Sequence, residues 1–61
     1  MDKIYVVFCF RVEDPISYHK TPEGAKKAVD DLKAEFRADN PNAEADYVEH
    51  YAWFTDEELQ D

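Results

Sequence analysis

The run from Lys3 to Val12, KIYVVFCFRV, constrains the fold most, because it consists largely of β-branched and aromatic residues. Such residues favour a β-strand, in which successive side chains point to opposite faces of the sheet. Both faces of this strand would be largely apolar. One would carry Ile4, Val6, Phe8, Phe10 and Val12, and the other Tyr5, Val7, Cys9 and Arg11. We therefore predict a central strand whose second face is either covered or available to a partner.

A turn, a short strand and a helix are predicted next. Glu13-Asp14-Pro15 is typical of a turn because proline fixes φ, and residues 16–19 can form a short returning strand. Thr21-Pro22-Glu23 combines an N-cap, a proline at the first helical position and an acid in the first turn. The helix should run to about Ala38. Its apolar stripe, at spacings of three and four, is Ala25, Ala28, Val29, Leu32 and Phe36.

The segment from Asp46 to Phe54 is predicted as a strand, because aromatic residues and a valine are concentrated there. A helix from Ala43 to Ala52 is the alternative, since alanines and a valine would form a stripe along it. Thr55-Asp56-Glu57-Glu58 then matches a helix capping box. We therefore predict a short C-terminal helical turn beginning at Asp56.

Together these elements predict an α+β fold in one small domain, residues 1–61. The strand directions give a three-stranded antiparallel sheet of order 2-1-3 with one helix packed on one face. If residues 16–19 are only a loop, a two-stranded β-α-β unit remains, and two strands are marginally stable alone. The single cysteine excludes an internal disulfide. Self-association or partner binding is the expected source of additional stability.

The acidic charge is concentrated in the last part of the chain. The formal net charge is -8, from 15 acidic and 7 basic residues. Residues 1–38 contain as many bases as acids, whereas residues 39–61 contain acids and no base. A field of this sign repels polyanions, so direct binding to nucleic acid through phosphate contacts is not expected. The abundance of aromatic residues argues against plain disorder.

Few side chains suggest catalysis, a cofactor or a metal. Cys9 with His19 or His50 is the one set that resembles a nucleophile and a base, but nothing in the sequence lowers the pKa of the thiol. The same three residues lack the spacing of a metal site. One glycine in the chain excludes a glycine-rich phosphate loop. We therefore expect no enzymatic activity, no cofactor and no metal, with a small Cys/His enzyme as the remote alternative.

No membrane segment or secretion signal is expected. The longest uncharged stretch, Ile4 to Phe10, is far shorter than the roughly 20 residues that span a bilayer. A soluble protein in a reducing compartment fits the single cysteine. We therefore expect a cytoplasmic protein, in the host cell cytoplasm if the chain is phage-encoded.

An aromatic and acidic surface is predicted to bind a partner. If Val48, Ala52 and Phe54 face the helix, the other aromatic residues of the last strand should share the opposite face with Tyr5. Tyrosine and tryptophan are the usual anchors of interfaces. The reverse arrangement, with the tyrosines in the core, would result from a one-residue shift in register. The predicted partner-binding residues are Tyr5, Tyr47, Glu49, Tyr51, Trp53, Asp56, Glu57 and Glu58.

In layout the chain resembles small acidic α+β proteins of phages and mobile elements. The resemblance rests on the opening strand from Met1 to Val7, the helix start Thr21 to Glu23, and the acid-flanked Tyr47 to Glu49. Many characterised phage proteins of this size and charge bind and block a host enzyme or defence complex, and some mimic the charge of DNA. The resemblance implies a similar role but assigns no functional residue.

The sequence therefore predicts a non-enzymatic protein-binding module that inhibits or modulates a host macromolecular complex by occlusion. An aromatic sheet face would supply contact area, and the acidic final third would supply steering and specificity. The partner could be a nucleic-acid-binding host or defence protein, in which case the acids mimic nucleic-acid charge. The alternative is a self-assembling homodimeric structural or accessory protein, in which the sheet face forms the dimer core.

Overall fold

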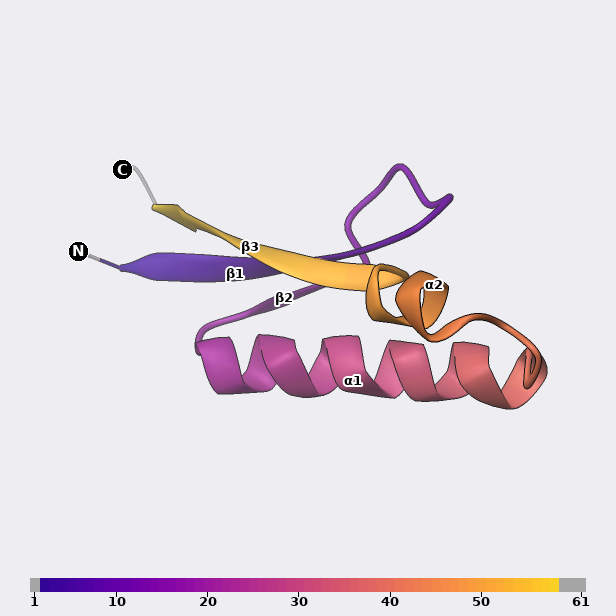
Figure 1. Ribbon diagram of the computed structural model, residues 1–61. Helices are drawn as coiled ribbons and strands as arrows, with labels where there is room; N and C mark the ends of the chain where they lie inside the picture. The colour runs from indigo at the N-terminus through magenta and orange to yellow at the C-terminus, as the bar shows by residue number, and fades with distance from the viewer. Residues whose placement is uncertain (1, 59–61) are drawn as a thin grey trace.

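A three-stranded sheet lies over one long helix in the computed structural model, which describes residues 2–58 (Figure 1). Along the chain the elements are β1 (Lys3–Cys9), β2 (Ser17–His19), α1 (Pro22–Asp39), α2 (Ala45–Glu49) and β3 (Ala52–Glu58). The sheet is antiparallel, with strand order β2-β1-β3. The predicted α+β fold, its central first strand and its sheet order are confirmed, but β1 ends at Cys9 and does not extend to Val12 as predicted.

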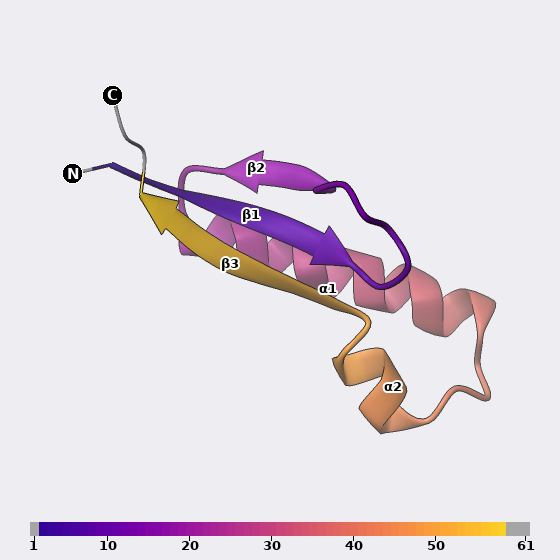
Figure 2. The same cartoon turned by 90° about the horizontal axis from the view of Figure 1, so that it is seen from above.

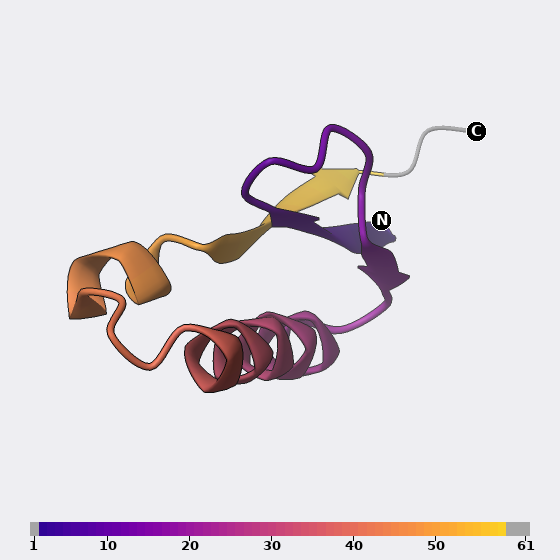
Figure 3. The same cartoon turned by 90° about the vertical axis from the view of Figure 1, so that its right-hand side faces the viewer.

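The hydrophobic core lies between the sheet and α1 (Figure 3). Its buried members come from β1, α1 and β3, and Val7, at 0% exposure, is the largest side chain that is fully buried. The buried residues of this core are Val7, Ala25, Val29 and Ala52, with Tyr5, Ala28, Leu32 and Tyr51 packed against them. The predicted apolar stripe of the helix is therefore the face that α1 turns toward the sheet.

The start of α1 follows the predicted capping arrangement. The Thr21 hydroxyl accepts a hydrogen bond from the backbone N–H of Gly24 at 3.1 Å, and Pro22 occupies the first helical position. A Cβ at Gly24 would lie 3.2 Å from the Thr21 hydroxyl oxygen and 3.4 Å from Nδ1 of His19. The glycine thus leaves room for the cap. At the other end the Asn40 N–H donates to the Phe36 carbonyl at 2.9 Å.

The connection between β1 and β2 rises on the side of the sheet opposite α1 (Figures 1 and 3). It begins with a tight turn in which the Val12 N–H donates to the Cys9 carbonyl at 3.2 Å. Arg11 adopts a φ of 72° in this turn, a left-handed conformation that is unfavourable for a residue with a side chain. The chain rejoins the sheet where the Ile16 N–H donates to the Val7 carbonyl at 2.8 Å.

The strand predicted from Asp46 is wrong over its first half. Residues Ala45–Glu49 form α2, and β3 begins only at Ala52. Backbone hydrogen bonds from Val48 to Glu44 and from His50 to Asp46, at 3.1 and 3.2 Å, hold this helical turn. The turn buries Val48 where α2 contacts α1. Burial of this one side chain against α1 outweighs the β-propensity of the neighbouring aromatic residues.

The C-terminal helical turn predicted from Asp56 is also wrong where the structure describes it. Asp56, Glu57 and Glu58 continue β3 and lie opposite Tyr5, Ile4 and Lys3 of β1. Pairing with β1 satisfies the backbone groups on one side of this segment, whereas a helix of one turn would gain few internal hydrogen bonds. The Lys3–Asp56 ion pair at 3.2 Å accompanies this pairing. The rest of the predicted turn, residues 59–61, lies outside the described residues.

Neither helix within residues 2–58 combines the length and the apolar character that a bilayer crossing requires.

Truncating Val7 tests the position of the core. We expect Val7→Ala to lower the free energy of unfolding by about 2 kcal/mol, because it leaves a cavity between the sheet and α1. The matched control, Val12→Ala in the β1–β2 connection, removes the same atoms from a side chain that is 44% exposed. It should change stability by no more than about 0.5 kcal/mol. Equal losses in urea denaturation would contradict this placement of the core.

Candidate functional site

The side of the sheet that faces away from α1 is the main candidate surface, and we call it the outer face. Figure 2 views the sheet from this side, with α1 behind it. Strand alternation and the register of pairing determine which side chains lie on it. They are Ile4, Val6 and Phe8 of β1, Tyr18 of β2, and Trp53, Thr55 and Glu57 of β3. Neither helix covers this face.

Aromatic rings dominate the outer face and remain accessible. Trp53 stacks on Phe8 with ring centroids 6.1 Å apart and an interplanar angle of 21°. Trp53 is nevertheless 43% exposed and Tyr18 is 61% exposed. Val6, whose cross-strand neighbours are Tyr18 and Thr55, is only 2% exposed. The outer face is therefore a packed apolar layer with accessible aromatic side chains.

A second group of aromatic rings lies where α1, α2 and the end of β1 meet. Phe36 of α1 stacks on Tyr51 at 4.2 Å and on Tyr47 at 5.4 Å between ring centroids. Phe10 meets Tyr47 edge to face at 5.7 Å. We call Phe10, Phe36, Tyr47 and Tyr51 the junction cluster. These ring contacts hold α2 against α1, so packing alone explains the presence of Tyr47 and Tyr51 at these positions.

The predicted binding residues do not form one surface. Tyr5 lies on the helix side of the sheet, where it contacts Phe54 edge to face at 6.2 Å. Trp53 and Glu57 lie on the outer face, and Tyr47 and Tyr51 belong to the junction cluster. The predicted common face of Tyr5, Tyr47, Tyr51 and Trp53 is therefore wrong. The cause is the register of β1 with β3, which pairs Val7 with Phe54 and Phe8 with Trp53.

The acidic residues of the final third divide between two ends of an elongated molecule, whose extents are 45 × 22 × 15 Å. One group lies at the end of β3, beside the start of β1, and the other lies on and around α2 (Figure 2). The β3 group is Asp56, Glu57 and Glu58, and the α2 group is Glu44, Asp46 and Glu49. All six are exposed. The outer face therefore adjoins the acidic end of β3.

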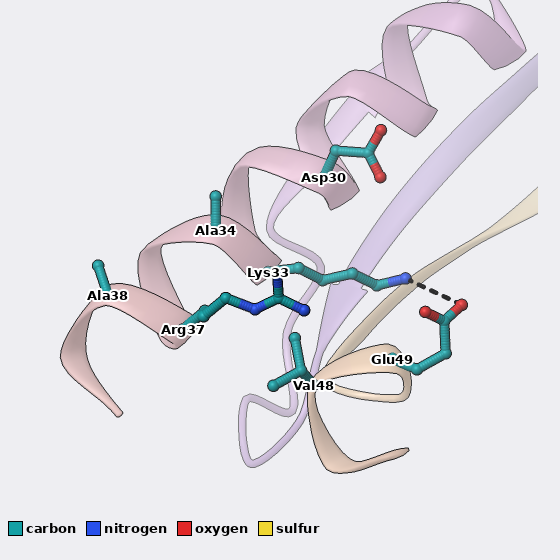
Figure 4. Close-up of a pocket in the computed structure, with 7 residues that line it drawn as sticks. All are labelled: Asp30, Lys33, Ala34, Arg37, Ala38, Val48 and Glu49. Carbon is teal, nitrogen blue, oxygen red and sulfur yellow. Dashed lines mark ion pairs between the residues drawn. The ribbon is translucent and has the colours of Figure 1, made fainter. Parts of the chain in front are cut away.

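A shallow pocket lies between α1 and α2 (Figure 4). Lys33 and Arg37 of α1 approach it from one side, and Val48 and Glu49 of α2 from the other. The Lys33 ammonium pairs with the Glu49 carboxylate at 3.6 Å. Glu49 is one of the residues predicted to bind a partner, but in the structure its ion pair with Lys33 also links α2 to α1.

Cys9 and His19 do not come together as a catalytic pair. Cys9 is 4% exposed, and its thiol lies 3.7 Å from the Phe10 carbonyl oxygen. His19 pairs with Tyr5 at the far end of β1, about 13 Å along the strand from Cys9. His19 instead contacts the Ser17 hydroxyl at 2.7 Å. Across residues 2–58, no group of three or more His, Cys, Asp or Glu side chains is arranged to hold a metal ion.

Sequence reasoning missed two residues of the outer face, Phe8 and Tyr18. The sequence places Phe8 on the same strand face as Ile4 and Val6, and the structure confirms that grouping. The sequence does not indicate that this face stays open, since the helix could lie on either side of a strand that is apolar on both faces. The aromatic side chain of Tyr18 in the short returning strand was the available signal.

The chain matches no protein-family model, no curated protein and no solved structure. The resemblance to phage and mobile-element proteins therefore stays a prediction from the layout of the sequence.

Replacing Tyr51 tests its position beside Cys9 through the titration of its hydroxyl. The Cys9 thiol beside it, and then partial burial, raise the pKa of the Tyr51 hydroxyl above its usual value. The neutral form is favoured in the folded state, so this stabilisation is present below pH about 10 and is lost as the pH rises through the folded pKa. We expect Tyr51→Phe to remove a late component from the tyrosinate absorbance titration.

The matched control for this titration is Tyr18→Phe, which makes the same change on the exposed outer face. It should leave the late component in place. Persistence of that component in Tyr51→Phe would contradict the assignment, provided that the variant is folded.

Proposed function

We propose that this protein is a non-enzymatic protein-binding module that covers a surface of a macromolecular partner and so inhibits or modulates it. The observation that supports the proposal best is the outer face, where Trp53 stacks on Phe8 and yet remains 43% exposed. Tyr18, at the other side of the same face, is also exposed. Accessible aromatic side chains held by packing against their neighbours are the usual anchors of protein interfaces.

The charge distribution supports a partner with a basic surface. Asp56, Glu57 and Glu58 lie beside the outer face at the end of β3, and the part of the sequence that contains them has no base. Charge of one sign around an apolar contact surface raises the association rate and selects partners of opposite charge. Because the two acidic groups lie at opposite ends, this arrangement favours steering over imitation of a continuous row of phosphates.

A homodimer formed through the outer face alone is less well supported. Three strands spaced about 4.8 Å apart, with about 3.3 Å per residue along the longest strands, give a footprint of roughly 300 Å² per copy. An area of this size is small for any stable interface, so it does not distinguish a homodimer from a complex with another protein. The charge does distinguish them, because two chains of net charge -8 would repel each other.

Partner capture with matched variants tests the proposal. Full-length protein would be immobilised, proteins captured from its native host would be identified by mass spectrometry, and the leading partner would be purified for calorimetry. We expect Trp53→Ala to weaken binding by about 2 kcal/mol, since it removes the large aromatic anchor that β3 contributes to the outer face. The control is Tyr47→Ala, which removes an aromatic side chain of similar exposure from the junction cluster. Its effect on affinity should be small.

Equal affinities for wild type, Trp53→Ala and Tyr18→Ala would refute the outer face as the binding surface. Sedimentation of the pure protein distinguishes the homodimer: a tight dimer that Trp53→Ala dissociates would replace our proposal with self-assembly.

A further inference from the structure

The free edge of β3 is the second feature of the sheet that is open to a partner. β3 is an edge strand, because β1 lies on one side of it and no strand of the described residues lies on the other. Figure 2 shows this edge running clear of both helices along most of its length. An unpaired edge presents backbone N–H and C=O groups that can pair with another extended chain.

The hydrogen-bond pattern identifies which residues present those groups. Beyond the end of β1, the Phe10 N–H donates to the Tyr51 carbonyl at 2.7 Å. Hydrogen-bonded pairs recur at every second position of an antiparallel ladder. Trp53, Thr55 and Glu57 therefore direct their backbone groups toward β1. Phe54 and Asp56, which alternate with them, direct theirs toward the free edge.

The side chains along this edge change from aromatic to acidic. Trp53 and Phe54, one on each face of the sheet, are both partly exposed. Asp56, Glu57 and Glu58 follow at the other end of the strand, again distributed over both faces. Lys3 lies 3.2 Å from Asp56 and offsets one of these three charges, so this end of the strand remains negative. A complementary strand would be apolar beside the aromatic pair and basic beside the acids.

We propose that β3 receives an extended segment of a partner protein as a fourth strand, with Lys or Arg residues beside the acids and apolar residues beside Trp53 and Phe54. This inference rests on the proposed function and names the chemistry of the partner. Pairing would supply main-chain hydrogen bonds, and side chains on alternate sides would supply selectivity. The added strand would also widen the outer face, whose own footprint is small.

A second copy of this chain fits the edge poorly. Antiparallel pairing of two β3 strands centred on Thr55 would set Asp56 of each copy beside Phe54 of the other, and Glu57 beside Trp53. Glu57 would lose water next to Trp53, which is unfavourable. Asp56 would likewise lose water next to Phe54, with only the exposed Lys3 beside it. Parallel pairing would align the acids directly, and like charges opposite one another destabilise a sheet. The occupant is therefore a basic segment and not this chain.

Synthetic peptides added to the full-length protein test this inference. The first probe, Lys-Arg-Lys-Thr-Val-Tyr-Val, sets its basic residues beside the acids of β3 if the two strands are antiparallel. The second probe has the reversed order and does the same if they are parallel. We expect one of the two to bind, with affinity falling as salt is raised. A peptide with Glu-Asp-Glu in place of the basic residues should bind at least about tenfold more weakly. Equal binding of basic and acidic peptides would overturn the proposal.

Main-chain methylation separates strand pairing from simple charge attraction. Two versions of the bound peptide would carry N-methyl groups on alternate residues, one set at odd positions and the other at even positions. Only one set can face β3, so we expect one version to lose binding and the other to retain it. Equal affinities of the two versions would show that no ladder forms and would overturn the proposal.

Substitutions of Asp56 test the proposed strand pairing by changing the protein instead of the peptide. Asp56→Pro removes the N–H that points to the free edge without removing a hydrogen bond to β1, a position where strands tolerate proline. Asp56→Ala is the matched control, because it removes the same charge and the same ion pair but keeps the N–H. We expect Asp56→Ala to weaken peptide binding severalfold and Asp56→Pro to abolish it.

Folding of both Asp56 variants would be confirmed by circular dichroism. Equal binding by these two folded variants would overturn the inference.

These outcomes separate the inference from the proposed function. If wild type binds none of the peptides but still captures a partner in a manner sensitive to Trp53→Ala, the edge inference fails and the protein-binding module stands. If a peptide binds at the edge but Trp53→Ala and Tyr18→Ala leave partner affinity unchanged, the outer face fails as the surface of that module. A wild-type dimer that Asp56→Pro dissociates would assign the edge to a second copy and overturn the inference.

Discussion

The pairing of β1 with β3 is the constraint on which the rest of the structure depends. These strands are neighbours although they come from opposite ends of the chain, and their register sets Val7 opposite Phe54 and Phe8 opposite Trp53. That register assigns Val7 to the core and Trp53 to the outer face. A shift of one residue in β3 would reverse the assignment of its side chains. The candidate binding surface is therefore a direct consequence of strand pairing.

The junction cluster explains how a short chain can hold this register. Tyr51 immediately precedes β3 and stacks on Phe36 of α1, while its carbonyl accepts a hydrogen bond from Phe10 at the end of β1. The same residue thus connects the helix to both strands. With one buried cluster among residues 2–58 and no disulfide, such contacts carry a large share of the order in a domain of this size.

The sequence correctly predicted the elements whose formation depends mainly on residues close to one another in the chain. The Thr21 cap, the stripe of α1 and the central β1 all follow from residue type and spacing, and the structure confirms them. The predictions from the sequence fail where contacts between residues far apart in the chain determine the secondary structure. Val48 favours α2 through burial against α1, and Asp56 joins β3 through pairing with β1. Because β1 is apolar on both faces, its sequence could not indicate which face would remain open.

Amide hydrogen exchange by NMR tests the central claim, that β3 pairs with β1 in this register and is free along its other edge. The account predicts slow exchange for the N–H groups of Trp53 and Thr55, which point to β1, and fast exchange for those of Phe54 and Asp56, which point outward. Slow exchange at Trp53 and Thr55 alternating with fast exchange at the other two would confirm the open edge. Equal protection at all four, or the reverse alternation, would contradict the account.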